Sequence, residues 1–250
     1  MVRESLTTLG RHQRDARALL AASLGLLGCS RPPPPPSPAT PLRSATCLGP
    51  TDATSFAVYL HGVDEAGISD QELENRRTLD AVARELSMRI ALPRASKPCP
   101  TQPGELCWGW TFDEPELDAA ATAVKDAAAS CFGAPRPFGL IGFSNGGYLV
   151  TKLLRTCSLH QRLPRASWMM TVGSAMNHGP LEGSPADLSA CGRLVMLVGT
   201  RDTYNFDPHE ELLHGLEAKH ADVHSVRFDG GHGVPLEATR EAVAALLRLP

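Results

Sequence analysis

Residues 138–147 read Phe-Gly-Leu-Ile-Gly-Phe-Ser-Asn-Gly-Gly. The uncharged apolar run at 138–143 is typical of a strand buried on both faces, and apolar positions with helical spacing continue through 146–155. Ser144 stands between the two runs in a Gly-x-Ser-x-Gly turn, whose glycines let a strand and a helix crowd together without Cβ clashes. The stretch therefore predicts a strand, a sharp turn that presents a serine hydroxyl, and a helix.

The same strand-then-helix order recurs along the chain. Strands are expected at residues 56–60, 89–92, 138–143, 168–172, 194–198 and 223–228, and helices at 71–86, 116–129, 146–155, 208–219 and 236–247. This alternation predicts the α/β class, with a mostly parallel, doubly wound sheet. Only about 20 residues separate the strands at 168–172 and 194–198, so no large lid domain is expected. Functional side chains should lie on loops beyond the carboxyl ends of the strands.

A serine hydroxyl reacts only when a base takes its proton, so the turn requires an acid and a histidine later in the chain. Asp202 comes just after the strand at 194–198, and His232 lies in a glycine-rich loop after the strand at 223–228. His232 is predicted to take the proton of Ser144, and Asp202 to hold the imidazole and stabilise its cation.

Other acids and histidines compete for these roles. Asp207 and Asp229 are expected to cap a helix and a turn, and His209 and His214 to be solvated on a helix.

The anion that forms during acyl transfer needs backbone N–H donors. The N–H of Asn145, directly after the serine, is the first expected donor. The strand at 56–60 ends in His61-Gly62-Val63, so Val63 is the expected second donor, with Gly62 allowing close approach. His61 is interpreted as a buried histidine that bonds neighbouring backbone, and not as the base.

Together, the His-Gly turn, the serine turn and the late Asp and His resemble the α/β-hydrolase superfamily over residues 55–249. Residues 106–112, Leu-Cys-Trp-Gly-Trp-Thr-Phe, resemble the Cys-Trp-x-Trp loop of secreted polyhydroxybutyrate depolymerase and feruloyl-esterase-like proteins. The resemblance implies an α/β-hydrolase fold, hydrolysis of a small or polymeric carboxylic ester through an acyl-enzyme, and no cofactor. It places Trp108 and Trp110 in an acyl or aromatic pocket, although one of them could instead pack in the core.

Other functions remain open at this point. The same triad could serve a thioesterase or an acyl-peptide hydrolase, and a non-catalytic, hydrolase-like binding module is a further alternative. A formal charge of -3, from 24 Lys and Arg against 27 Asp and Glu, argues against nucleic acid as a partner. The His and Cys spacing predicts no metal site. The sequence does not decide the oligomeric state.

The N-terminal residues have the pattern of an export signal rather than of a folded domain. Arginines precede an apolar run at residues 18–28, and the run ends in Leu26-Leu27-Gly28-Cys29, which resembles the lipobox of bacterial lipoproteins. Residues 1–28 are therefore interpreted as a signal peptide, Cys29 as the lipidated residue, residues 29–46 as a proline-rich tether, and residues 47–250 as the catalytic domain. The expected location is the bacterial cell envelope, at the outer membrane or cell surface and held by the lipid, or otherwise outside the cell after ordinary secretion.

Six cysteines remain besides Cys29: Cys47, Cys99, Cys107, Cys131, Cys157 and Cys191. An even number in an exported protein predicts disulfides, and a Cys99–Cys107 bond would close a short Pro- and Gly-containing loop. Buried reduced thiols are the alternative.

Overall fold

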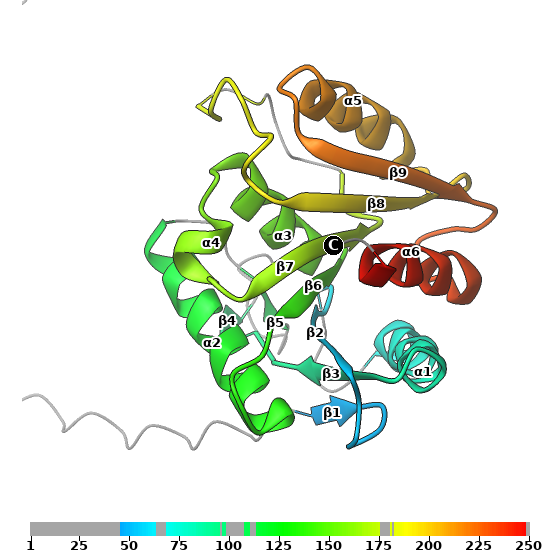
Figure 1. Cartoon of the computed structure of the whole chain (residues 1–250). Coiled ribbons are helices and arrows are strands. Elements are labelled where there is room, and N and C mark those ends of the chain that lie inside the picture. Colours follow the sequence, from blue (N-terminus) through cyan, green and yellow to red (C-terminus); the bar gives the residue numbers. More distant parts are fainter. Residues whose placement is uncertain are drawn as a thin grey trace, which may run out of the picture. The chain divides into compact units, whose positions relative to one another are not determined.

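The computed structural model describes residues 46–63, 69–95, 97–98, 108–110, 114–175, 181 and 183–248. The chain divides into residues 1–41 and 42–250, and every described element belongs to the second unit (Figure 1). The predicted signal peptide, most of the tether and Cys29 lie outside the described residues. Their boundaries stay predictions.

Seven strands form the main sheet. They are β1 (Thr46–Leu48), β2 (Ser55–Leu60), β3 (Met88–Leu92), β6 (Phe138–Phe143), β7 (Ala166–Val172), β8 (Arg193–Gly199) and β9 (Asp222–Phe228), in the order β1-β3-β2-β6-β7-β8-β9. All neighbours pair in parallel except β1, which is antiparallel to β3. A separate pair joins β4 (Lys97–Pro98) to β5 (Trp108–Gly109). The predicted, mostly parallel α/β sheet is confirmed.

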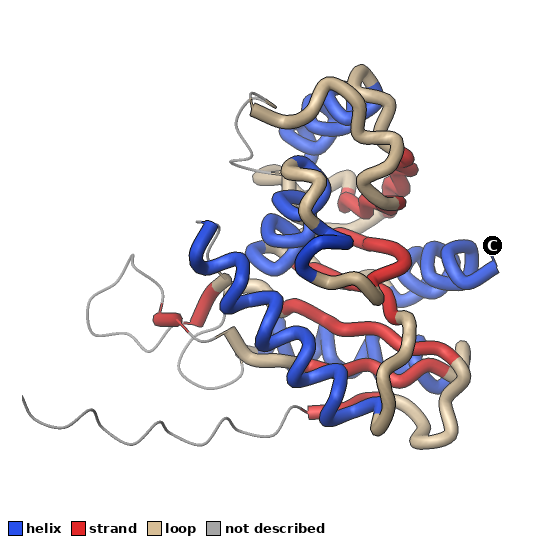
Figure 2. The backbone as a smooth tube through the Cα atoms, turned by 60° about the vertical axis from the view of Figure 1, so that its left-hand side comes forward, coloured by secondary structure: helices blue, strands red, loops and turns tan. Residues whose placement is uncertain are grey.

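Helices cover both faces of the sheet. Residues of α1 (Asp70–Glu85) and α6 (Leu236–Arg248) join one core cluster, and residues of α2 (Glu114–Phe132), α3 (Asn145–Arg155) and α5 (Phe206–Glu217) join the other. Figure 1 shows α1 and α6 together on one side of the sheet, with α2 and α3 on the opposite side. The short α4 (Leu159–Arg162) follows α3, and the tube in Figure 2 shows the same layers from another side.

The strands alternate their side chains between the two cores, because successive residues of a strand point to opposite faces. In β2, Ala57 and Tyr59 join the α1–α6 core, whereas Val58 and Leu60 join the α2–α3–α5 core. All four are at most 1% exposed. Burying each large apolar side chain contributes about 1.5–3 kcal/mol, so both faces of the sheet are taken up by packing. Polar functional side chains must therefore lie at the ends of the strands.

Two disulfides tie peripheral segments to this core. Cys47–Cys131 links β1 to α2, and Cys157–Cys191 links the end of α3 to the segment before β8. The prediction of disulfides is confirmed for these four cysteines, while Cys99 and Cys107 lie outside the described residues. Within the described ranges, no helix combines the length and the apolar character needed to cross a membrane.

Candidate active site

Ser144 occupies a strained turn between β6 and α3. Its backbone angles are φ 49° and ψ -116°, in the left-handed half of the map that residues with a Cβ rarely adopt. A Cβ on Gly142 would lie 2.6 Å from the carbonyl oxygen of Gly146, and a Cβ on Gly146 would lie 2.1 Å from that of Leu60. The two glycines are therefore required for the approach of helix to strand, as the sequence predicted. The turn holds the serine at the carboxyl end of β6.

The predicted acid and base lie together beyond β8 and β9. Asp202 is 2% exposed, and its Oδ2 accepts a hydrogen bond from Nδ1 of His232 at 2.7 Å. The His232 ring also packs against Phe143, with 4.8 Å between ring centroids. Because Nδ1 is committed to the carboxylate, Nε2 is the ring nitrogen left for proton transfer.

Asn205 holds the carboxylate of Asp202 in place, a role that the sequence did not reveal. Its Nδ2 donates to both oxygens of Asp202 at 3.1 Å and lies 3.3 Å from Nδ1 of His232. Its Oδ1 accepts the N–H of Ala175 at 3.1 Å. Asp202 Oδ1 also accepts the backbone N–H of Tyr204, at 3.3 Å. A buried carboxylate surrounded by donors has one orientation, and this orientation fixes the imidazole.

Tyr148 of α3 adds a further donor to this group. Its hydroxyl donates to Oδ1 of Asn205 at 3.5 Å. Burial and, to a smaller extent, the negative charge of Asp202 raise the pKa of Tyr148 to about 12. The tyrosine therefore keeps its proton, and remains a donor, throughout the neutral range.

Gly173, directly after β7, makes room for the acid–base pair. Its φ is +54°, and a Cβ there would lie 2.8 Å from Nδ1 of His232 and 3.1 Å from Oδ2 of Asp202. Any larger residue would therefore meet both partners of the hydrogen bond. A glycine directly after a buried strand was the only sequence signal for this role.

Ser144 and His232 share one cavity of about 250 Å³. Its walls are formed by Gly62, Val63, Ser69, Gln71, Glu72, Phe143, Ser144 and His232. The fold thus brings together residues from the end of β2, the start of α1, the serine turn and the loop after β9. The polar groups of α1 in this wall were not predicted.

His61 orients the turn that carries one of the expected oxyanion donors, the N–H of Val63. The imidazole is 2% exposed, and its Nε2 accepts the N–H of Ala95 at 3.0 Å, so Nδ1 carries the proton and donates to the carbonyl of Gly62 at 2.6 Å. The C=O and N–H of a trans peptide point in opposite directions, so the N–H of Val63 points away from His61.

The second expected donor is the N–H of Asn145. Asn145 begins α3, and the first N–H groups of a helix have no partner within it. That the N–H groups of Val63 and Asn145 act as oxyanion donors stays a prediction.

Trp110 packs in the core and is absent from the walls of this cavity. It is 5% exposed, its indole N–H donates to the carbonyl of His61 at 3.1 Å, and its backbone N–H donates to Oδ1 of Asn145 at 2.5 Å. Of the two alternatives given for the tryptophans, core packing therefore applies to Trp110, which braces the serine turn against the His-Gly turn. The side chain of Trp108 lies outside the described residues.

A buried polar network connects α1 to the loop of His232. Asn75, 1% exposed, accepts the N–H of Val234 at 3.1 Å and donates to the hydroxyl of Tyr59 at 3.4 Å. That hydroxyl donates to Glu72 at 3.0 Å, and Glu72 pairs with Arg76 at 2.7 Å. Burial, with a further contribution from the charge of Glu72, raises the pKa of Tyr59 well above its usual value. The loop of His232 is thus anchored to the Asn75 amide, which in turn is held by the neutral phenol of Tyr59.

The competing residues take no part in this arrangement. Asp207 lies in the first turn of α5, and Asp229 is exposed and pairs with Arg201 at 3.4 Å. His209 is 2% exposed and lies 2.7 Å from the hydroxyl of Ser225, so the expectation that it is solvated is wrong. In the part of the chain that the structure describes, no group of three or more His, Cys, Asp or Glu side chains could hold a metal ion.

Solved structures share this architecture. A carboxylesterase from Mesorhizobium loti superposes with a TM-score of 0.58 at 20% identity, over 82% of this chain and 94% of that one. Acyl-protein thioesterase 2 from Zea mays gives a TM-score of 0.59 at 19% identity, over 81% and 98% of the two chains. At these identities the likeness shows the fold alone, an α/β-hydrolase fold without a large lid.

Sequence comparison gives the family. No curated protein matches the chain. The sequence profile of a family described as serine hydrolase (FSH1) matches residues 73–243. This range is more than half of the chain and includes Ser144, Asp202 and His232, so the chain belongs to this serine hydrolase family.

Proposed function

We propose that the protein hydrolyses carboxylic esters, with Ser144 as nucleophile, His232 as base and Asp202 as the group that orients the base. One observation carries the proposal. The Asp202–His232 hydrogen bond of 2.7 Å commits Nδ1, while His232 and the strained Ser144 face the same cavity. This combination supplies a presented hydroxyl together with a fixed imidazole.

In the proposed reaction, Nε2 of His232 takes the hydroxyl proton of Ser144 as Oγ attacks the carbonyl carbon of the ester. The C=O pair moves onto the oxygen, and the N–H groups of Asn145 and Val63 bind the resulting oxyanion. When the C–O bond breaks, His232 returns the proton to the departing alcohol and the acyl group stays on Ser144. Water then attacks the acyl-enzyme by the same route and releases the acid.

Labelling with a fluorophosphonate tests the nucleophile. A single phosphonylated residue at Ser144, together with a loss of turnover of roughly 10³-fold or more in Ser144→Ala, is the expected result. Asp202→Ala and His232→Ala should lose turnover similarly while remaining folded. A folded Ser144→Ala variant that keeps most of its activity would contradict the assignment. A wild-type protein that neither labels nor turns over esters would instead favour the non-catalytic alternative.

A substrate panel narrows the proposal. Short and long acyl esters form its base, and hydroxyalkanoate oligomers and feruloyl esters are included because residues 106–112 resemble the loop of proteins that act on such substrates. Thioesters and acyl-peptides form the competing arm, since the structural neighbour from Zea mays is described as an acyl-protein thioesterase. Higher kcat/KM on oxygen esters than on matched thioesters supports the proposal, and the reverse order replaces it by a thioesterase.

We further propose that the protein is exported and lipidated at Cys29, with residues 1–28 removed. The two disulfides support an oxidising compartment, because disulfides persist there. Metabolic lipid labelling of the full-length chain and of Cys29→Ser, followed by cell fractionation, tests the anchor. A labelled wild type in the membrane fraction and an unlabelled, released variant are expected. Equal partitioning of the two proteins would contradict the anchor and leave simple secretion.

A further inference from the structure

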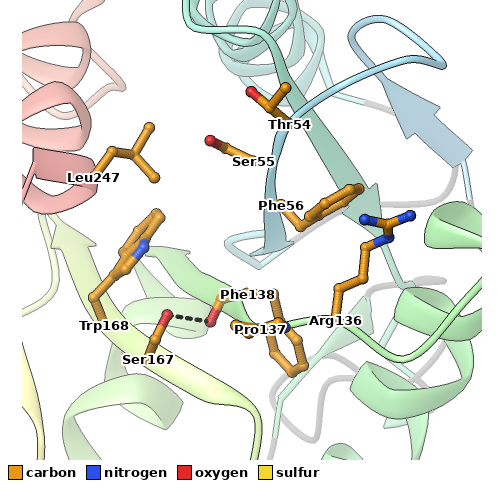
Figure 3. Close-up of a pocket in the computed structure, with 9 residues that line it drawn as sticks. All are labelled: Thr54, Ser55, Phe56, Arg136, Pro137, Phe138, Ser167, Trp168 and Leu247. Carbon is orange, nitrogen blue, oxygen red and sulfur yellow. Dashed lines mark hydrogen bonds between the residues drawn. The ribbon is translucent and has the colours of Figure 1, made fainter. Parts of the chain in front are cut away.

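A second cavity, of about 270 Å³, lies at the opposite end of the sheet from Ser144. Its walls include Ser55, Phe138 and Trp168, which stand at the beginnings of β2, β6 and β7 (Figure 3). Ser144 follows the carboxyl end of β6, whereas this cavity lies at the beginnings of β2, β6 and β7. Because these strands are parallel, the two cavities open at opposite ends of the strands. This cavity is therefore not part of the proposed catalytic site.

The indole N–H of Trp168 faces this cavity without a protein acceptor. Trp168 is only 6% exposed, and in the described part of the chain its N–H has no hydrogen-bond partner. Figure 3 shows the indole nitrogen on the side of the ring that faces the other lining residues. The nitrogen is not one of the fully buried unsatisfied donors of the structure, so it is accessible from the cavity, where an acceptor atom of a ligand can take the place of water.

The lining is positively charged. Arg136 contributes a guanidinium, and none of the nine lining residues is acidic. Arg136 also has no carboxylate partner within the described ranges, because its contact there is with the ring of Phe56, at 4.9 Å from the centroid. Thr54 and Ser55 add hydroxyl groups, and the Ser167 hydroxyl donates to the carbonyl of Phe138 at 3.3 Å. Phe138 and Leu247 add apolar surface. A ligand with a negative charge, an oxygen acceptor and an apolar body would complement these walls.

The indole of Trp168 is held in place before any ligand binds. A Cβ on Gly139 would lie 2.1 Å from the Trp168 ring, so the ring rests directly on the backbone of β6. The Phe56 ring that carries Arg136 packs on Phe132, with 4.9 Å between centroids. Arg136 itself is exposed, so the fixed donor of the cavity is the indole, which loses little conformational entropy when a ligand binds.

We propose that this cavity binds a small organic carboxylate with an aromatic or aliphatic body. The Trp168 N–H and the Ser55 hydroxyl donate to the oxygens of the ligand, Arg136 supplies the opposite charge, and Phe138 with Leu247 contacts the body. A carboxylate fits better than a phosphate, because the lining has a single cation and mostly apolar walls. Drug-sized ligands need about 300–1,000 Å³, so the ligand is small.

Heteronuclear NMR of the indole N–H groups tests this site directly. The chain has three tryptophans and therefore three indole signals, and Trp168→Phe identifies that of Trp168 by its loss. Phenylacetate is the probe, and it is added to the Ser144→Ala protein so that the catalytic cavity stays chemically inert. We expect a saturable shift of the Trp168 signal with a Kd on the order of 1 mM. The Trp110 signal, next to the serine turn, should move little.

Two charge variants separate a built site from a generally cationic surface. Arg136→Gln should weaken binding about tenfold, as expected for loss of one charge-assisted contact. Arg165→Gln is the matched control, because Arg165 lines the neighbouring cavity beside α2 and not this one, and it should change the Kd less than twofold. Ser55→Ala provides a second, smaller perturbation of the same site.

Several results would overturn the proposal. These are a Trp168 signal that does not move at saturating phenylacetate, equal effects of the two arginine variants, or an equal response to inorganic phosphate. A shift confined to the Trp110 signal would assign the binding to the catalytic end instead. None of these results depends on ester hydrolysis, so failure here and failure of the proposed function are distinguishable.

Discussion

The Asn75 side chain accepts a hydrogen bond from the backbone N–H of Val234 at 3.1 Å, across 159 residues of sequence. Val234 follows His232 by two residues, so a helix at the start of the domain holds the loop of the base. Asn75→Ala leaves the Val234 N–H and the Tyr59 hydroxyl without this partner. We expect a loss of about 1–3 kcal/mol in the free energy of unfolding and a fall in kcat of about tenfold, as the imidazole loses its fixed position.

Steady-state kinetics and urea unfolding measure the two effects. Arg77→Ala is the control, because Arg77 lies on the same helix but is exposed, and it should change neither quantity appreciably. An Asn75→Ala protein with reduced stability but wild-type kcat would show that Asn75 is merely structural.

Gly173→Ala tests the room left for the acid and the base. The new Cβ would lie 2.8 Å from Nδ1 of His232, and a residue with a Cβ at φ +54° is strained as well. We expect kcat to fall by at least about tenfold, because displacing a catalytic group by up to about 1 Å lowers the rate strongly. Ester turnover and thermal unfolding are the measurements.

The matched control is Gly183→Ala. Gly183 has φ +77°, but a Cβ there meets nothing within 4 Å, so this variant carries the backbone cost of about 1 kcal/mol without touching the site. Equal losses of turnover in both variants would contradict a specific role for Gly173.

The sequence predicted the three residues of the proposed triad because the chemistry of a triad restricts both residue type and position. A glycine-flanked serine after a buried strand, an acid after β8 and a histidine after β9 can be identified without knowing any contact. The six expected parallel strands and five helices are confirmed for the same reason, since each has a long enough apolar pattern. By contrast, β1 has three residues and α4 has four, which is too short for any period to be visible.

The supporting residues could not be predicted, because their roles depend on partners distant in sequence. Asn75 and Asn205 are ordinary polar residues until the fold brings them to Val234 and Asp202. Trp110 illustrates a choice that the sequence left open, because a tryptophan near the site can either line a binding surface or pack in the core. Its N–H groups are instead taken by His61 and Asn145.

The Cys157–Cys191 disulfide should stabilise the fold without affecting catalysis. It joins the end of α3 to the segment before β8 and spans 34 residues. Cys191 precedes the beginning of β8, whereas Ser144 follows the carboxyl end of β6, so the bond lies at the other end of the parallel strands. The chain-entropy relation gives about 4 kcal/mol for such a loop. In denaturant unfolding, the double variant Cys157→Ser/Cys191→Ser should lose a large part of this free energy of unfolding, while its kcat stays at the wild-type value. A thiol titration that finds both cysteines free in the oxidised wild type would contradict the bond.

His209 should make the stability of the protein depend on pH. Burial lowers its pKa to about 4, with smaller and opposing effects of Glu210 and Arg227, whereas the unfolded chain has a value of about 6.5. Between these two values the unfolded state binds the proton and the folded state does not, so the free energy of unfolding decreases as the pH falls from 6.5 towards 4. The contribution of this one group reaches about 3 kcal/mol at the lower end.

Chemical denaturation at a series of pH values measures this dependence. His209→Gln cannot take up a proton, and it keeps a polar group near the Ser225 hydroxyl, so its stability curve should be flatter than that of the wild type between pH 6.5 and 4. His214→Gln removes an exposed histidine from the same helix and should leave the wild-type slope intact. If the His209 variant retained the full slope, the decrease would have to arise from other groups. His209 would then not be the neutral imidazole that its burial indicates.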